Sequence, residues 1–408
     1  MHNQISFSEI LQVENGIVFF SPEGNGLYLL EKGRKEAELL AHFEAGAGEL
    51  PYKTIIKAGN KMFLPPCMAD DIVVYDYDTK KLQTAGLDKA YAGEKGSFKF
   101  WTGIAYGDYV YFAGHYYPAI IKMNIHTLEM SYLTDWVEKL EEKRMLRDEP
   151  YLGTGMIQED IALFPCCCAN MILKLNLKTD ETRLCEIPAD VNGFNGICFF
   201  ENTYWMTSRI SNKIVLWNQS TEHVEAMEVE TEKQNIGKRL FRPPVMLNGR
   251  LYLFPVEADC AYYVNMNGRK IEKEELVNEV LNSETEKQGG LRKTAGPPVL
   301  VGGNIYFITG EGSVWHIYNP ALKEMDSLSV SINISGQKTI KKENALKSFR
   351  GSVSERKETV IFEEEKFFSC KEFLELVNEY QDKITDLRGQ ASIPENNTGR
   401  QIYERLKV

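Results

Sequence analysis

Residues 58–79, AGNKMFLPPCMADDIVVYDYDT, are the stretch that decides the fold. The Gly59-Asn60 pair predicts a tight turn, and residues 61–64 predict a strand that ends at Pro65-Pro66. A polar loop then leads to a second strand, Ile72 to Tyr77. Six more stretches repeat this plan, with turns at Asn15-Gly16, Gly107-Asp108, Glu159-Asp160, Glu201-Asn202, Asn248-Gly249 and Gly302-Gly303.

The spacing of these turns indicates the architecture. Successive turns lie 42 to 54 residues apart, and the strands that follow them are short and rich in Val, Ile, Tyr and Phe. A repeat of about 40–50 residues with several short strands is typical of a β-propeller blade. We therefore predict an all-β fold, a single seven-bladed β-propeller, over residues 1–335.

Two insertions and a tail depart from the repeat. Residues 136–147, WVEKLEEKRMLR, predict a short helix, and residues 271–287 are charged and carry apolar side chains at helical spacing, so both are predicted as helical insertions. Residues 336–408 are predicted to hold a linker, a closing strand at Thr359–Phe362 and C-terminal helices. An apolar stripe between Phe373 and Leu387 follows a capping box and predicts an amphipathic helix that packs on the propeller or meets a partner.

The strand plan resembles kelch repeats. The resemblance lies in Ile72-Val73-Val74-Tyr75-Asp76 and in residues 314–320, VWHIYNP, and the repeated plan covers roughly residues 5–335. It implies a kelch-like propeller. Because propellers of this kind include both enzymes and adaptors, the resemblance implies no particular function.

Charge and composition exclude several classes of protein. The formal net charge is −11, so a nucleic-acid partner is not expected, because an acidic surface repels phosphate. No apolar run is long enough to predict a membrane span, and the first residues do not resemble a secretory signal. The eight cysteines lack disulfide-scaffold spacing, which favours a cytoplasmic, reduced protein.

The cysteines do not predict a metal site or a catalytic residue. Cys67, Cys166 and Cys260 stand in comparable loops, yet the sequence has no CxxC or HxxxH pair, so free thiols are the favoured interpretation. A nucleophile made of Cys166 or Cys167 with His115 is a weaker alternative. No metal, no cofactor and no catalytic residue is assigned.

Five residues are predicted to bind a ligand on one face of the ring. The loops between second and third strands share a face with those between a fourth strand and the next first strand. Trp101, His115, Arg209, Arg242 and Glu257 fall in or beside these loops. Arginine with tryptophan around a polar mouth suits a sugar or a carboxylate.

Two function classes follow. The first is a binding protein, a scaffold or adaptor whose loop face takes part in a protein–protein interaction or holds a carbohydrate or small acidic ligand. The second is an enzyme that acts on an oligosaccharide or an acidic small molecule at the mouth of the channel. Convergence of His115, Arg209, Arg242 and Glu257 would favour the enzyme, and their scatter would favour the adaptor.

Overall fold

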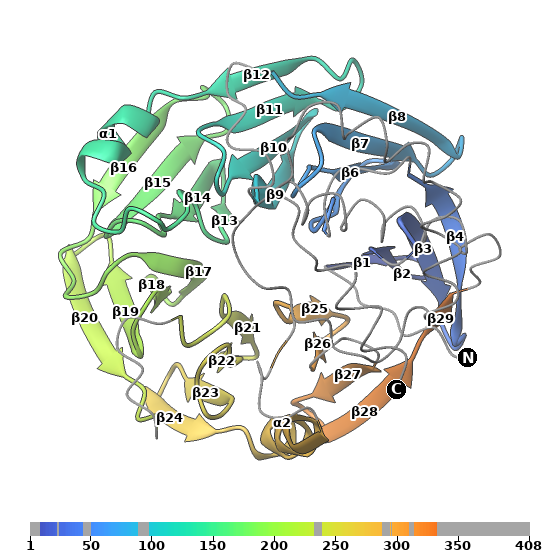
Figure 1. The fold of residues 1–408 in the computed structure, drawn as a ribbon. Coiled ribbons are helices and arrows are strands. Elements are labelled where there is room, and N and C mark those ends of the chain that lie inside the picture. Colours follow the sequence, from blue (N-terminus) through green and yellow to red (C-terminus); the bar gives the residue numbers. More distant parts are fainter. Residues whose placement is uncertain are drawn as a thin grey trace, which may run out of the picture. The chain divides into compact units, whose positions relative to one another are not determined.

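The computed structural model describes residues 9–22, 24–43, 50–88, 98–231, 239–287, 294, 296–309 and 314–332. The chain divides into two compact units, residues 1–334 and 335–408, and every described residue lies in the first. Within the described ranges the strands form seven antiparallel sheets, one of which has an added parallel strand. Figure 1 shows them as blades around a ring, with the first strand of each blade innermost and the fourth outermost. The predicted seven-bladed propeller is confirmed.

The first three blades have strands of three to seven residues. Blade one contains β1 (Ile10–Val13), β2 (Gly16–Ser21), β3 (Gly26–Glu31) and β4 (Glu36–His42). Blade two contains β5 (Ile56–Ala58), β6 (Lys61–Leu64), β7 (Asp71–Asp76) and β8 (Lys81–Gly86). Blade three contains β9 (Phe100–Tyr106), β10 (Tyr109–Gly114), β11 (Ile120–Asn124) and β12 (Met130–Leu133).

The other four blades follow the same order. Blade four contains β13 (Met156–Gln158), β14 (Ile161–Pro165), β15 (Met171–Asn176) and β16 (Thr182–Glu186). Blade five contains β17 (Phe194–Phe200), β18 (Thr203–Ser208), β19 (Lys213–Asn218) and β20 (His223–Glu228). Blade six contains β21 (Val245–Leu247), β22 (Arg250–Leu253), β23 (Tyr262–Asn265) and β24 (Lys270–Lys273). Blade seven contains β25 (Val299–Val301), β26 (Asn304–Ile308), β27 (Val314–Asn319) and β28 (Glu324–Ser329).

Six of the seven predicted turns join the first and second strands of a blade at the predicted residues. In blade two, for example, Ala58 pairs with Lys61 across Gly59-Asn60, and Gly59 has a φ of 60°. The turn of blade one is the exception, because Val13 pairs with Gly16 and the loop residues are Glu14 and Asn15. Gly16 is therefore a strand residue. A Cβ atom there would lie 2.1 Å from the Leu30 carbonyl oxygen. A glycine is therefore needed at this position because β3 approaches β2 closely, and not because of the turn.

The two helical insertions are present but shorter than predicted. Helix α1 spans Val137–Glu142, within the predicted residues 136–147. Helix α2 spans Glu275–Lys287. Residues 271–273, predicted as helical, instead complete the outer strand β24, where they pair with β23. The predicted closing strand and C-terminal helices lie outside the described residues. No helix in the described ranges is both long and apolar enough to cross a membrane.

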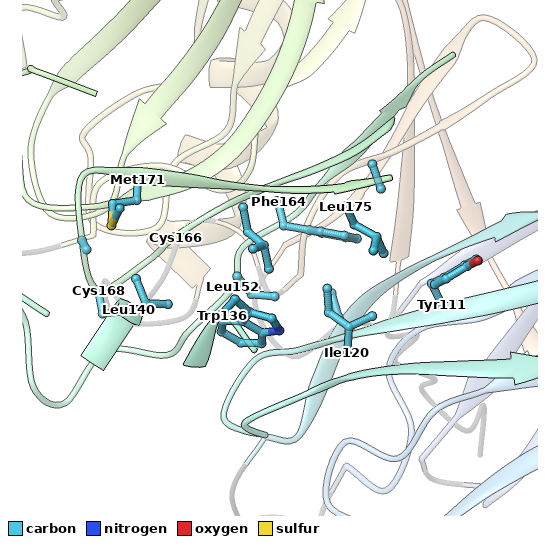
Figure 2. Close-up of a cluster of buried hydrophobic side chains, with 14 of the residues drawn as sticks. Tyr111, Ile120, Trp136, Leu140, Leu152, Phe164, Cys166, Cys168, Met171 and Leu175 are labelled. Carbon is cyan, nitrogen blue, oxygen red and sulfur yellow. The ribbon is translucent and has the colours of Figure 1, made fainter. Parts of the chain in front are cut away.

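Adjacent blades pack through continuous apolar interfaces. Figure 2 shows the one between blades three and four, where Ile120 and Phe164 lie beside Trp136, at the start of α1. Cys166 and Cys168 are buried in this cluster. An insertion that the sequence marks as a break in the repeat is therefore part of an inter-blade core.

The ring closes through a short strand directly after blade seven. Strand β29 (Ser331–Ile332) adds to blade one in parallel with β4, and the Ser331 N–H donates to the Lys35 carbonyl over 2.9 Å. Blades one and seven also share an apolar cluster that includes Phe19 and Trp315. Closure within the described residues thus depends on a two-residue strand and on side-chain packing.

Replacing Ser331 with proline is expected to lower the free energy of unfolding by about 1–2 kcal/mol, because proline cannot donate the hydrogen bond to Lys35. Equilibrium urea unfolding measures the change. Ser331→Ala keeps the backbone donor and is the matched control, expected within about 0.5 kcal/mol of the parent. Equal stability of the two variants would show that β29 does not contribute to closure.

Candidate functional site

Polar and charged side chains gather where inner strands begin and second strands end. Lys53 precedes β5, Trp101 lies at the start of β9, His115 follows β10, and Arg209 follows β18. Arg239 and Arg242 precede β21. We refer to these side chains as the Trp101 cluster: Lys53, Trp101, His115, Arg209, Arg239 and Arg242.

Trp101 is the centre of the cluster. The His115 ring stacks on it with centroids 4.0 Å apart and an interplanar angle of 13°. Lys53 Nζ lies 3.4 Å from the Trp101 ring centroid, so it must occupy the opposite face, because His115 fills the first. The Arg239 guanidinium carbon lies 5.6 Å from the same ring. A side chain therefore lies over each face of Trp101, so a sugar could not stack there without displacing His115 or Lys53.

His115 is held as a neutral imidazole. Its Nδ1 donates a hydrogen bond of 2.7 Å to the Leu152 carbonyl, which fixes the proton on that nitrogen. Burial lowers the pKa of His115 well below its usual value, and the nearby Arg209, Lys53 and Arg239 lower it further. The ring therefore contributes no positive charge at neutral pH.

Arg209 and Arg242 are buried and anchored by oxygen atoms. Arg209 Nε donates to the Glu149 carboxylate over 2.5 Å, and its Nη1 donates to Asn195 Oδ1 over 3.0 Å. Arg242 Nε donates to Thr294 Oγ1 over 3.3 Å, and its Nη2 donates to the Thr294 carbonyl. These bonds hold both guanidinium planes in place, which is the arrangement that suits recognition of a planar anion.

Lys53 and Arg239 differ from that pair because neither forms an ion pair with a carboxylate in the described part of the chain. Burial lowers the pKa of Arg239 well below its usual value, and Arg209 and Arg242 add to the effect. Lys53, Arg209, Arg239 and Arg242 bring four basic side chains to the cluster, and the carboxylates of Glu9 and Glu149 lie near enough to affect their charges. A concentration of basic side chains attracts anions.

The structure brings four of the five predicted ligand-binding residues together. Trp101, His115, Arg209 and Arg242 belong to the cluster. Glu257 lies in the loop after β22, where its backbone N–H contacts the Leu240 carbonyl over 3.3 Å. That bond places the loop beside the segment that carries Arg239 and leads into β21.

Lys53 and Arg239 are members of the cluster that the sequence analysis missed. Both lie in the segments just before inner strands, in the loop set that already supplied Trp101 and Arg242. A consistent search of those positions for basic residues would have found them. Their packing on Trp101 has no signal in the sequence, because they come from blades two and six.

The thiols near the site are buried and protonated. Burial raises the pKa of Cys67 to about 11 against the opposing charge of Lys53, and burial also raises the pKa of Cys167. The indole N–H of Trp101 makes no hydrogen bond of ordinary geometry with the described residues, and its contact with the Cys67 thiol opposes the rise in the pKa of Cys67. Cys166 lies in the core between blades three and four, which argues against its pairing with His115 as a nucleophile. No group of three or more metal-binding side chains occurs among the residues that the structure describes.

Comparison with known proteins identifies the fold. No protein-family model and no curated protein sequence matches the chain. Virginiamycin B lyase from Staphylococcus aureus aligns with a TM-score of 0.53 at 11% identity, over 76% of this chain and 95% of that one. A streptogramin B lyase aligns with a TM-score of 0.52 at 13% identity, over 75% of this chain and 92% of that one. The fold is a seven-bladed β-propeller.

A third structure widens the range of propellers that share this fold. The extracellular domain of a proposed one component system from B. thetaiotaomicron aligns with a TM-score of 0.50 at 10% identity, over 80% of this chain and 47% of that one. At these identities the likeness shows the fold and carries no activity. The kelch-like resemblance is confirmed as to the propeller and no further.

Proposed function

We propose that this propeller binds a small organic acid at the Trp101 cluster. The observation that carries the proposal is the meeting of Lys53, Arg239 and Trp101 with two anchored arginines, Arg209 from blade five and Arg242 from blade six. Guanidinium groups that are fixed in place match the planar, bidentate geometry of a carboxylate. Partial burial strengthens each charge interaction relative to water.

Two features favour an acid over a carbohydrate. Both faces of Trp101 are covered, by His115 and by Lys53, so the stacking that holds a sugar ring would require a rearrangement. The positive charges of Lys53 and Arg239 have no carboxylate ion-pair partner among the described residues, and a bound anion would supply one. The ligand class is therefore set by charge and not by ring stacking.

Replacing Arg239 with methionine is expected to weaken citrate binding by about tenfold or more, since a charge-assisted hydrogen bond contributes about 1.5–3 kcal/mol. Isothermal titration calorimetry with citrate measures the change. Arg269→Met is the matched control, because Arg269 pairs with Glu225 on the outer part of the ring, and its affinity should change less than about twofold. Equal affinities of both variants, or no citrate binding by the parent, would contradict the proposal.

Sulfate binding at this site is expected to weaken as the pH rises through 7. Burial lowers the pKa of Lys53 to about 7, so Lys53 is charged below that pH and neutral above it. Sulfate does not titrate in this range, so the protein accounts for any change. We expect about a fivefold loss of affinity between pH 6 and 8, equal to about 1 kcal/mol. A Lys53→Met variant should show a shallower profile in the same calorimetric titration, with the remaining slope caused by Glu9, whose pKa burial raises to about 7.

An enzyme that acts on the bound acid is the second candidate function. The observation in its favour is the convergence of His115, Arg209 and Arg242, since neutral His115 could accept a proton and the arginines could hold the substrate. His115→Phe keeps the stack on Trp101 and removes the base. For an enzyme this variant would bind the acid and fail to convert it, whereas for a binding protein the two forms would behave alike.

A further inference from the structure

We propose that Lys53 holds a 2-oxo acid covalently, as a Schiff base formed between its Nζ atom and the ketone carbon. This inference rests on the proposed function, because the same cluster would hold the acid's carboxylate. It names the substrate class and the residue that bonds to it.

The surroundings of Lys53 are unusual for a lysine. It lies half-buried just before β5, and its Nζ stands 3.4 Å from the centroid of Trp101. No hydrogen bond or ion pair joins this amine to the described residues. The charged and titratable groups that face it are Cys67, Arg239, Glu9 and Arg242. An amine in such a place can react, since no carboxylate of the described ranges lies within ion-pair distance of it, although Glu9 faces it.

These surroundings favour the neutral amine, which is the nucleophilic form. Burial removes water from the ammonium group, and Arg239 and Arg242 repel its charge, so the pKa of Lys53 falls to about 7. Desolvation beside other cations is an established way to activate a lysine for Schiff-base formation. Lys99, another buried lysine of this face, differs in its contacts, because its Nζ donates to the Ala69 carbonyl and pairs with Asp70.

Glu9 is placed to move protons in the reaction. Its Oε2 is buried and has no hydrogen-bond partner among the described residues. Burial raises the pKa of Glu9 to about 7, against the opposing charge of Lys53. A buried carboxyl oxygen without a partner, beside a buried amine, is the arrangement that general acid catalysis needs.

The reaction balances without an oxidant or a reductant. The Nζ lone pair of Lys53 attacks the ketone carbon, the carbon–nitrogen bond forms, and a proton passes from nitrogen to the former carbonyl oxygen. Protonated Glu9 then gives its proton to that hydroxyl, which leaves as water. The products are an iminium on Lys53, the Glu9 carboxylate beside it and one water molecule. Arg239, which also packs on Trp101, and Arg242 supply the positive charges that would hold the acid's carboxylate.

Reductive trapping tests the inference on the full chain. Incubation with pyruvate and sodium cyanoborohydride, followed by digestion and peptide mass spectrometry, should place the adduct on Lys53. Trapping at that residue should rise from pH 6 to a maximum near pH 7 and fall towards pH 8, because the reaction needs both the neutral amine of Lys53 and the protonated carboxyl of Glu9. Lactate has the same carboxylate without the ketone and should give no adduct. Lys53→Arg should lower total adduct by about tenfold, and Lys99→Arg should leave it unchanged.

The outcomes separate this inference from the proposed function. Peptide mapping of the parent protein locates the adduct even if Lys53→Arg folds poorly. Calorimetric binding of pyruvate without an adduct on Lys53 would overturn the Schiff base and leave the acid-binding proposal standing. Adducts spread evenly over exposed lysines would also overturn it. Failure of pyruvate, citrate and sulfate to bind would overturn both proposals.

Discussion

Replacing Trp315 with alanine is expected to lower the free energy of unfolding by about 3–5 kcal/mol, the range for truncation of a large buried aromatic side chain. Trp315 is fully buried in the apolar cluster that joins blades seven and one. Its ring meets Phe19 edge to face, with centroids 4.9 Å apart. Because this interface closes the ring, the cavity left by alanine weakens the contact between the first and last blades. Denaturant midpoints at a constant m value measure the loss.

Leu322 is the control for this substitution. It is 65% exposed, so Leu322→Ala should change the free energy of unfolding by less than about 0.5 kcal/mol. A loss of less than about 1 kcal/mol for Trp315→Ala would mean that blades one and seven do not pack as described. An unchanged midpoint with a lower m value would instead indicate a change in the unfolded state.

Removal of the Glu149 carboxylate is expected to destabilise the protein by about 2–3 kcal/mol, because Glu149→Ala leaves the buried Arg209 charge without its carboxylate. The Arg209 side chain is 8% exposed and that of Glu149 is 28% exposed, so partial solvation keeps the loss below that of a fully buried pair. Thermal and denaturant unfolding both report this change. Citrate should protect this variant more than it protects the parent, since a bound anion replaces the missing carboxylate.

Two further variants test whether the loss of stability comes from leaving the buried Arg209 without its carboxylate. Glu149→Gln retains an oxygen that can accept the hydrogen bond from Arg209, so it should lose less stability than the alanine variant. Asp190→Ala removes the fully exposed carboxylate that pairs with Lys213 and should change stability by less than about 0.5 kcal/mol. If Glu149→Ala and Asp190→Ala lose the same amount of stability, the buried ion pair of Arg209 contributes no more to stability than an exposed one.

The sequence by itself determined the blade plan, because turns and short strands depend on neighbouring residues. Six predicted turns have the predicted loop residues, and Gly59 and Gly107 adopt the positive φ that favours glycine. The prediction of the blade-one turn at Asn15-Gly16 was wrong because it also relied on neighbouring residues alone. An Asn-Gly pair is a strong local signal, yet the approach of β3 decided the role of that glycine.

The tertiary structure decided how the ring closes and what the site contains. The pair that closes the ring, Ser331 with Glu36, joins the last blade in the sequence to the first. A strand of two residues is too short to show a periodic pattern in the sequence. Trp101 was predicted from its loop, but its cover by Lys53 and His115 depends on blades two and three meeting at the axis. Charge, burial and ring contacts between blades are long-range properties. The sequence therefore determined the repeat, and only the packing of blades around one axis placed Lys53 and Arg239 on one tryptophan, with Arg209 and Arg242 close enough to affect their charges.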